Sequence, residues 1–225
     1  MLKPKPVDVA FGALALLLAL AVKAFYSHAG ASALAFVLVP SCWLAAHLGG
    51  LDLVAEDGAG FISHAHRMVV GPACAGVNFL VIAFLAVYLS RLVTGVGSRA
   101  RGLLFAAAVA YAATILTNGL RIILAAYLFQ LGGIGWFTPE RLHRLAGVVI
   151  YCLAVVTLCR AVAPERRSLL IPLGCYLGIA IGLPLLNGAA RNRLFVEHAL
   201  VVTAASLLVL AIARLTRRPL SDGYG

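Results

Sequence analysis

Apolar residues of this chain gather in seven long runs that are separated by short polar connections. The runs cover residues 7–26, 31–48, 75–93, 103–130, 145–163, 169–186 and 197–213. Lengths of roughly 20 residues suit an α-helix that crosses the hydrocarbon core of a bilayer. The regular in-and-out alternation of a membrane β-strand is missing from the sequence. We therefore predict an all-α, polytopic transmembrane helical bundle of about seven spans (six to eight), which forms one integral membrane domain over residues 1–225.

The composition supports a membrane protein and argues against several other classes. The chain is 63% hydrophobic and 12% charged, which is more apolar than a soluble domain of 225 residues could bury. Its net charge is +10, but the basic residues stand at the ends of the apolar runs, so no nucleic-acid partner is expected. The five cysteines are scattered without a CxxC pair, which argues against a disulfide framework or a zinc ribbon.

Three connections are rich in arginine, and they give the predicted spans an orientation. They cover residues 91–101, 160–168 and 214–225. Because basic connections stay on the cytoplasmic side, we place them there and expect a multi-pass protein of the cytoplasmic (inner) membrane. Alternation along the chain then puts the other connections on the outer (periplasmic) face. These are residues 49–73, 131–144 and 187–196. The first two spans fit less well, since this orientation leaves Lys3 and Lys5 outside and Lys23 at the inner end.

Cys74 lies in the segment "GPACAGVNFL" (71–80), where the third apolar run begins. Pro72 suits a first helical position, so Cys74 is predicted in the first turn of the third span. Free backbone N–H groups and the positive end of a helix favour a thiolate at such a place. Asn78, one turn further on, shares the helix face of Cys74. A buried structural cysteine explains the position of Cys74 equally well.

Arg121 lies within the fourth apolar run, in the segment "TNGLR" (117–121). Asn118 and Gly119 weaken a helix, so we expect an interruption of the fourth span here. An arginine inside a membrane helix costs about 2.5–3.5 kcal/mol on insertion scales and tends to face a polar cavity. Its flanks offer no carboxylate partner, which favours a substrate or a developing negative charge as its partner. An arginine that reaches outward to a water-filled dent is the alternative.

His143 is predicted at the outer start of the fifth span, in the segment "HRLAG" (143–147). Histidine is the side chain best suited to moving protons near neutral pH. Gly147, four residues later on the same face, would let a neighbouring helix come close. Taken alone, His143 is also consistent with an ordinary interfacial histidine. On the predicted topology, however, Cys74, Arg121 and His143 approach the same membrane face, and a thiol, a cation and a base serve acyl transfer.

The segments "ACAGVN" with Cys74, "NGLRI" with Arg121 and "HRLAG" with His143 carry a resemblance to a known family. In their order and spacing the chain resembles the exosortase/archaeosortase family of membrane cysteine transpeptidases, and it is most similar to the exosortase K subgroup. The resemblance covers about residues 60–165, which would form the catalytic core. Ala-Gly follows the cysteine where many relatives have Ser-Gly.

The resemblance implies a cysteine peptidase/transpeptidase that cleaves the C-terminal sorting signal of secreted proteins. Such a signal holds a short motif, a transmembrane helix and a basic cluster. Cys74 would form a thioester, Arg121 would stabilise the oxyanion and His143 would move protons. Supporting roles would fall to Asn78, Asn118 and Gly147. The acceptor would be a membrane lipid, a glycan or water, and neither a metal nor another cofactor is implied.

Two other classes stay open at this stage. A small-solute transporter would use Arg121 and an interrupted fourth helix as its substrate site, although the sequence has no internal repeat. A structural or assembly subunit would need no chemistry at all. The segment "SHAHR" (63–67) near Asp52 and Glu56 suggests a metal site, but a solvated loop explains it more simply because no third ligand is fixed.

Overall fold

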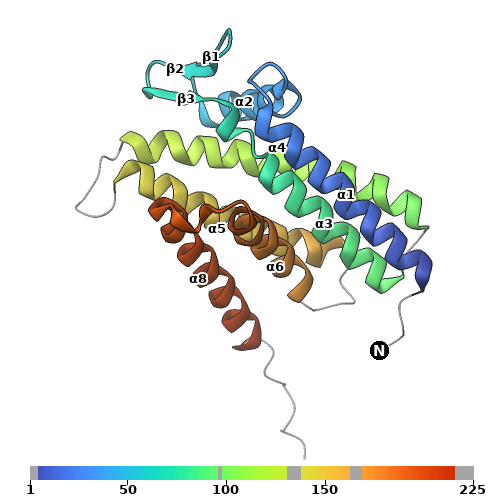
Figure 1. The fold of residues 1–225 in the computed structure, drawn as a ribbon. Coiled ribbons are helices and arrows are strands. Elements are labelled where there is room, and N and C mark those ends of the chain that lie inside the picture. The colour runs from blue at the N-terminus through green and yellow to red at the C-terminus, as the bar shows by residue number, and fades with distance from the viewer. Residues whose placement is uncertain (1–4, 96–97, 131–137, 163–168, 216–225) are drawn as a thin grey trace, which may run out of the picture.

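Helices make up most of the computed structural model, which describes residues 5–95, 98–130, 138–162 and 169–215 (Figure 1). The helices are α1 (Pro6–His28), α2 (Ala35–Gly49), α3 (Val77–Thr94), α4 (Arg99–Gln130), α5 (Pro139–Val162), α6 (Leu170–Leu177), α7 (Leu183–Leu186) and α8 (Arg193–Leu215). A π-helical turn (Gly178–Gly182) joins α6 to α7, and short 3₁₀ turns cover Pro72–Cys74 and Ala189–Arg191. The prediction of an all-α bundle is confirmed.

All seven apolar runs are helical, but their lengths differ. Five helical segments are long and apolar enough to cross a membrane, namely Pro6–His28, Pro72–Thr94, Arg99–Gln130, Arg141–Val162 and Arg193–Leu215. The segments Ala35–Gly49 and Leu170–Leu186 are shorter. At a rise of about 1.5 Å per residue, the 15 residues of α2 span only about 22 Å, which is less than a hydrocarbon core of about 30 Å.

The polar segment after α2 folds into a small sheet, which the sequence analysis treated as a loop. Strands β1 (Leu53–Glu56), β2 (Gly60–Ser63) and β3 (Met68–Val70) pair antiparallel in the order β1-β2-β3. Gly60 is required in this sheet because its φ is +110° and a Cβ there would lie 2.5 Å from the Val70 carbonyl oxygen. The sheet leads directly into Gly71 and the Cys74 turn.

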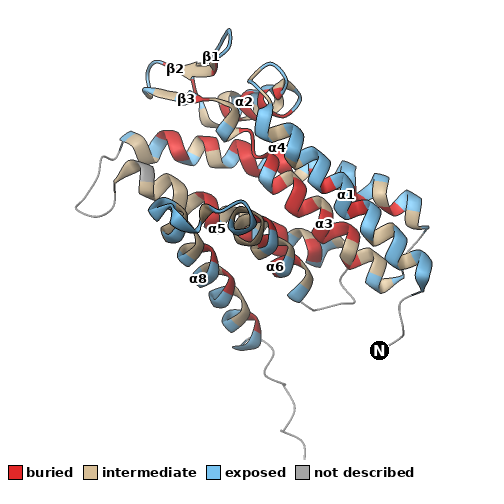
Figure 2. Cartoon of the chain, in the orientation of Figure 1, coloured by how far each residue is buried: buried red, intermediate tan, exposed pale blue. Residues whose placement is uncertain are grey.

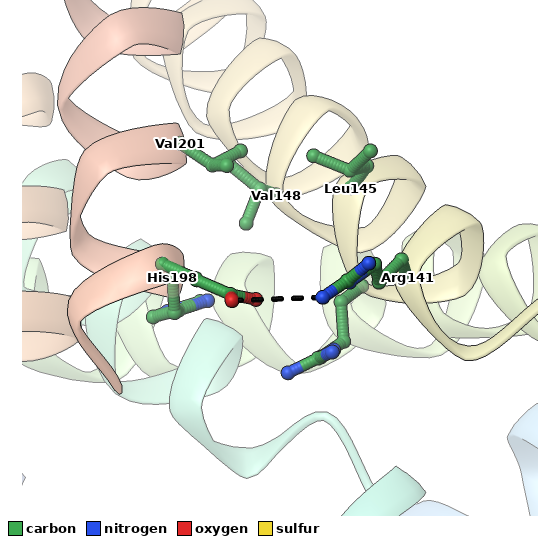
Figure 3. A pocket seen from close by; sticks show the side chains of 7 residues that line it. Arg141, Leu145, Val148, His198 and Val201 are labelled. Atoms are coloured by element: carbon green, nitrogen blue, oxygen red, sulfur yellow. Dashed lines mark ion pairs between the residues drawn. The ribbon is translucent and has the colours of Figure 1, made fainter. Parts of the chain in front are cut away.

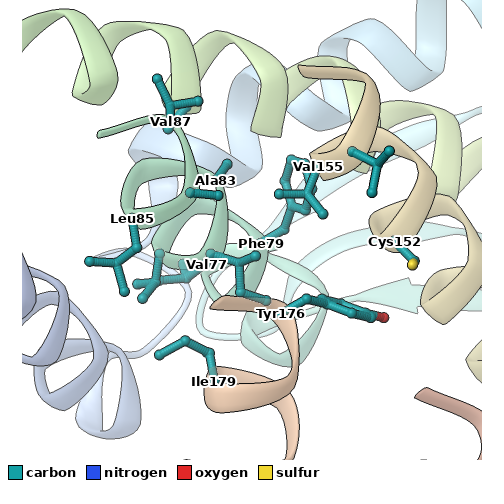
Figure 4. Close-up of a cluster of buried hydrophobic side chains, with 14 of the residues drawn as sticks. Val77, Phe79, Ala83, Leu85, Val87, Cys152, Val155, Tyr176 and Ile179 are labelled. Carbon is teal, nitrogen blue, oxygen red and sulfur yellow. The ribbon is translucent and has the colours of Figure 1, made fainter. Parts of the chain in front are cut away.

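Helix α3 is the centre of the bundle. It packs against α1, α4, α5 and α6, and most of its residues are buried (Figure 2). Val77, Phe79 and Ala83 of α3 meet Val155 of α5 and Tyr176 of α6 in one hydrophobic cluster (Figure 4). Because every face of α3 is apolar, it suits this central place, whereas α1 and α8 keep most of their surface exposed.

Contacts at the start and at the end of α1 identify the two ends of the bundle. Asp8 at the start of α1 forms an ion pair with Arg99 at the start of α4 (2.5 Å). Tyr26 near the end of α1 donates a hydrogen bond to the Pro72 carbonyl (3.3 Å) beside the sheet. We call the end with Asp8 and Arg99 the arginine end, and the end with Tyr26 and Pro72 the sheet end.

The expected course of the first two spans is wrong. Helix α2 lies beside α4 from Tyr111 to Tyr127, because Tyr111 donates to the Phe36 carbonyl (2.7 Å) and Tyr127 donates to the Gly49 carbonyl (3.1 Å). The chain therefore crosses the bundle once, not twice, before the sheet. As a result Lys5 lies at the arginine end and Lys23 at the sheet end, the reverse of the expectation. Lys3 and residues 131–137, 163–168 and 216–225 of the predicted connections lie outside the described residues.

The expected interruption of the fourth span is also wrong. Helix α4 continues without a break for 32 residues. Asn118 is buried and its side chain makes three hydrogen bonds. Gly119 allows Leu44 of α2 to pack closely, since a Cβ there would lie 2.5 Å from Leu44 Cδ2. Tertiary contacts thus outweigh the weak helix propensity of these two residues.

Candidate active site

Cys74 lies in a 3₁₀ turn before α3, and not in the first turn of that helix as predicted. The turn is closed by a hydrogen bond from the Cys74 N–H to the Gly71 carbonyl (2.8 Å). Gly76, the N-cap of α3, has a φ of +74°, a left-handed conformation that redirects the chain before the helix begins. Cys74 is half-buried. Its position is therefore set by the turn rather than by the helix.

Asn118 ties the Cys74 turn to α4. Its Nδ2 donates a hydrogen bond to the Cys74 carbonyl (2.9 Å). The turn and α4 approach so closely that a Cβ on Gly76 would lie 3.0 Å from Asn118 Cγ. Asn118, predicted as a supporting residue, thus holds the backbone of the candidate nucleophile.

Arg121 lies one turn after Asn118 and binds three neutral groups. Its Nη1 donates to Asn118 Oδ1 (3.2 Å) and to the Tyr151 hydroxyl (2.8 Å). Its Nη2 lies 3.1 Å from His143 Nε2. Through Asn118, which also binds the Cys74 carbonyl, Arg121 is linked to the Cys74 turn. In the described part of the chain, no carboxylate forms an ion pair with Arg121.

His143 is oriented by Arg121. A guanidinium can only donate hydrogen bonds, so Nε2 of His143 must be the acceptor and the ring is neutral with its proton on Nδ1. The Phe129 ring lies 6.1 Å from the imidazole, centre to centre. The structure therefore brings Arg121 and His143 into contact, and Asn118 joins Arg121 to the backbone of Cys74.

Tyr151 belongs to this network and was not singled out from the sequence. Its hydroxyl accepts from Arg121 and donates to Asn118 Oδ1 (3.0 Å), and its ring stacks on Phe79 at 4.8 Å. A signal was present, because His143, Gly147 and Tyr151 follow each other at four-residue intervals on one face of α5.

Gly147 leaves room for a side chain rather than for a neighbouring helix. A Cβ there would lie 3.3 Å from Arg121 Nε and 3.5 Å from Arg121 Cδ. The predicted supporting role of Gly147 thus has a definite form, since the glycine gives the guanidinium of Arg121 its space. Asn78 differs from the other predicted supporting residues. It is exposed, and its Oδ1 accepts a hydrogen bond from Lys23 Nζ (2.5 Å).

A cavity of about 290 Å³ opens beside the network. Its walls come from α1, the Cys74 turn, α3, α4, α5, the segment Tyr176–Pro184 and the start of α8. Arg121, His143 and Tyr151 face it from the network, and Ala73 places it next to Cys74. The cavity thus reaches beyond the predicted core of residues 60–165.

The histidines of the segment "SHAHR" pair with single carboxylates of the sheet. His66 lies 3.3 Å from Asp52 and His64 lies 3.8 Å from Glu56. Among the described residues, no group of three or more His, Cys, Asp or Glu side chains is arranged to hold a metal ion.

By fold and composition the chain is a membrane-spanning α-helical protein with a cavity that both cationic and apolar side chains line. No family model matches its sequence, no curated protein matches it, and no solved structure matches its fold. Any assignment of function therefore depends on the residues that meet at this cavity.

Proposed function

We propose that the protein is an exosortase-like membrane cysteine peptidase/transpeptidase with Cys74 as its nucleophile. One observation carries the proposal: Arg121 and His143 are in contact and line one cavity, and Asn118 joins Arg121 to the backbone of Cys74 beside it. A nucleophile, a fixed cation and a proton carrier are the groups that acyl transfer needs.

In the first half of the reaction the sulfur of Cys74 attacks the carbonyl carbon of a peptide bond. The carbonyl oxygen becomes an oxyanion, which the guanidinium of Arg121 stabilises. Preorganised donors of this kind are commonly worth several kcal/mol. Tyr151 and Asn118 hold Arg121 in place beforehand, so little reorganisation is needed. Collapse of the oxyanion breaks the C–N bond, gives a thioester on Cys74 and releases the amine.

His143 moves the protons. The departing amine needs a proton, and the incoming amine or water must lose one in the second half of the reaction. Nε2 of His143 is held by Arg121 in the resting structure. When substrate binds, Nη2 of Arg121 moves from Nε2 to the substrate carbonyl oxygen, while Nη1 stays on Asn118 and Tyr151. Nε2 then takes the thiol proton as the sulfur attacks and gives it to the departing amine. The acceptor then attacks the thioester, and Cys74 is regenerated with its proton.

The proposed location is the cytoplasmic membrane, with the sheet end outside. The arginine end holds Arg99 and Arg101 at the start of α4, and basic residues stay on the cytoplasmic side. The proposed substrates are secreted proteins with a C-terminal motif, helix and basic tail, and the acceptor is a lipid, a glycan or water.

The test uses intact cells that express the protein together with a secreted reporter carrying such a tail. Cys74→Ala should abolish reporter processing, and a hydroxylamine-sensitive thioester on Cys74 should be found only in wild type. Cys175→Ala, which removes another half-buried cysteine, is the matched control and should process normally. A membrane-impermeant maleimide should label Cys74 from outside. Normal processing by Cys74→Ala would disprove the proposal and bring forward a small-solute transporter with Arg121 at its substrate site, which solute flux would measure.

A further inference from the structure

Three cationic side chains face the cavity from three different helices. They are Lys23 of α1, Arg121 of α4 and Arg144 of α5. The residues that line the cavity include no aspartate and no glutamate. Within the described part of the chain, none of the three cations forms an ion pair. A membrane-embedded cavity with three uncompensated positive charges is costly, so an anionic partner is expected there.

Two of these cations have hydrogen-bond donors that no described residue uses. Lys23 uses one of its three ammonium hydrogens on Asn78, which leaves two. Arg144 makes no hydrogen bond with the described residues, and it lines the cavity together with His198 of α8. Arg121 differs, because Asn118, Tyr151 and His143 already hold it. Lys23 and Arg144 are thus available to a ligand that stays bound, while Arg121 belongs to the reaction.

The nearest carboxylate does not neutralise Arg144. Glu197 lies with Arg144 and His198 around a small pocket next to the cavity (Figure 3). Its carboxylate is shared between Arg141 (3.7 Å) and Arg193 (3.8 Å). The guanidinium of Arg144 is therefore available to an anion in the cavity.

We propose that Lys23 and Arg144 form a phosphate-binding site in this cavity. A phosphate monoester carries about −1.5 to −2 charges at neutral pH, which matches these two cations better than a single carboxylate does. A guanidinium binds two phosphate oxygens at once, and an ammonium adds a point charge. The cavity of about 290 Å³ is near the lower limit of ordinary ligand sites, about 300 Å³.

The phosphate has two possible sources. It is either free in solution or carried by a membrane lipid. The wall formed by Ile179, Ala180, Pro184 and Phe195 is apolar and suits the apolar part of a lipid. Binding needs no reaction at Cys74, so this inference and the proposed peptidase activity can fail independently.

The experiment measures the binding of inorganic phosphate to the purified full-length protein in neutral detergent, by calorimetry at constant ionic strength. Wild type should bind saturably. Lys23→Gln and Arg144→Gln should each bind at least about tenfold more weakly, because each loses a charge-assisted hydrogen bond. Lys23→Arg and Arg144→Lys keep the charge and should retain most of the affinity. Arg101→Gln removes an exposed charge at the arginine end and should bind like wild type.

A second arm uses nanodiscs with phosphatidic acid, compared with phosphatidylcholine, and measures the retained lipid. Saturation by inorganic phosphate identifies a site for free phosphate, and selective retention of phosphatidic acid alone identifies a lipid site. Thermal unfolding without phosphate verifies that each variant folds. The proposal is overturned if neither probe binds, or if Lys23→Gln and Arg144→Gln bind like wild type.

Discussion

Two arginines of the same helix, Arg99 and Arg121, have opposite surroundings. Arg99 at the arginine end is paired with the carboxylate of Asp8 (2.5 Å). Arg121, six turns further along α4, is held by an amide, a phenol and an imidazole, none of which is negative. Each guanidinium is fixed in position. Only Arg121, however, keeps a positive charge that no described carboxylate compensates.

The difference separates a structural arginine from a candidate functional one. An arginine that already has a carboxylate gains little from a second anion. An arginine held by neutral partners is oriented and still able to stabilise a negative charge that forms beside it. The two tyrosines near these arginines show the same contrast. Tyr151 uses its hydroxyl twice, whereas the buried hydroxyl of Tyr88 near Arg99 has no partner among the described residues.

Replacing each arginine by lysine should give the largest difference. Arg121→Lys loses the fork that reaches Asn118, Tyr151 and His143 together, so reporter processing should fall by about 10²–10³-fold. Arg99→Lys can still pair with Asp8 and should process within about twofold of wild type. Initial rates of reporter cleavage measure both. Equal losses in the two variants would contradict the functional distinction.

Removing each tyrosine hydroxyl should give the next largest effect. Tyr151→Phe leaves Arg121 and Asn118 without a shared partner, so kcat should fall about tenfold while KM changes little. Tyr88→Phe removes an unpaired buried hydroxyl, and its thermal midpoint should stay unchanged or rise. Steady-state kinetics and thermal unfolding separate the two results. A rise in KM without a fall in kcat for Tyr151→Phe would exclude a positioning role.

A methyl group added at Gly147 of α5 or at Gly102 of α4 should give a smaller effect. Gly147→Ala brings a Cβ to 3.3 Å from Arg121 Nε, and a shift of a few tenths of an ångström should lower processing about fivefold. Gly102→Ala places its Cβ at an ordinary 3.5 Å from the Tyr88 ring and improves helix propensity, so its thermal midpoint should rise. Normal processing by Gly147→Ala would show that Arg121 tolerates displacement.

The smallest effect is expected at Asp52, in the sheet. Hydrogen bonds from the Ser63 hydroxyl and the Ala65 N–H lower the pKa of the Asp52 carboxyl below its ordinary value of about 3.9. As the pH falls, the Asp52 carboxylate therefore takes up its proton in the unfolded state before it does so in the folded state. Its contribution to folding stability is present above about pH 4 and is lost as the pH falls through the folded-state pKa. Asp52→Asn should flatten the dependence of the thermal midpoint on pH below about pH 4. A dependence identical to that of wild type would show that Asp52 adds nothing to the sheet.

Much of the candidate site was predictable because its residues break an apolar pattern. Arg121 interrupts a helix that is otherwise hydrophobic, His143 lies just before the fifth apolar run, and Cys74 follows a Gly-Pro pair just before the third. Tyr151 was missed because an aromatic residue in an apolar run is ordinary. The membrane side of Lys23 was predicted wrongly because that side depends on whether α2 spans the membrane. Hydropathy alone predicts a span for any long apolar run.

The sequence by itself determined the class of fold, the seven helical segments and the three residues of the candidate site. It could do so because burial in lipid demands long apolar helices, against which each polar residue stands out. Only the tertiary structure decided that α2 stays on one side, that α4 runs unbroken through Asn118 and Gly119, and that Cys74 belongs to a 3₁₀ turn. It also placed Lys23 and Arg144 around one cavity with Arg121. These features depend on contacts between residues far apart in the chain, which local propensity and hydropathy do not encode.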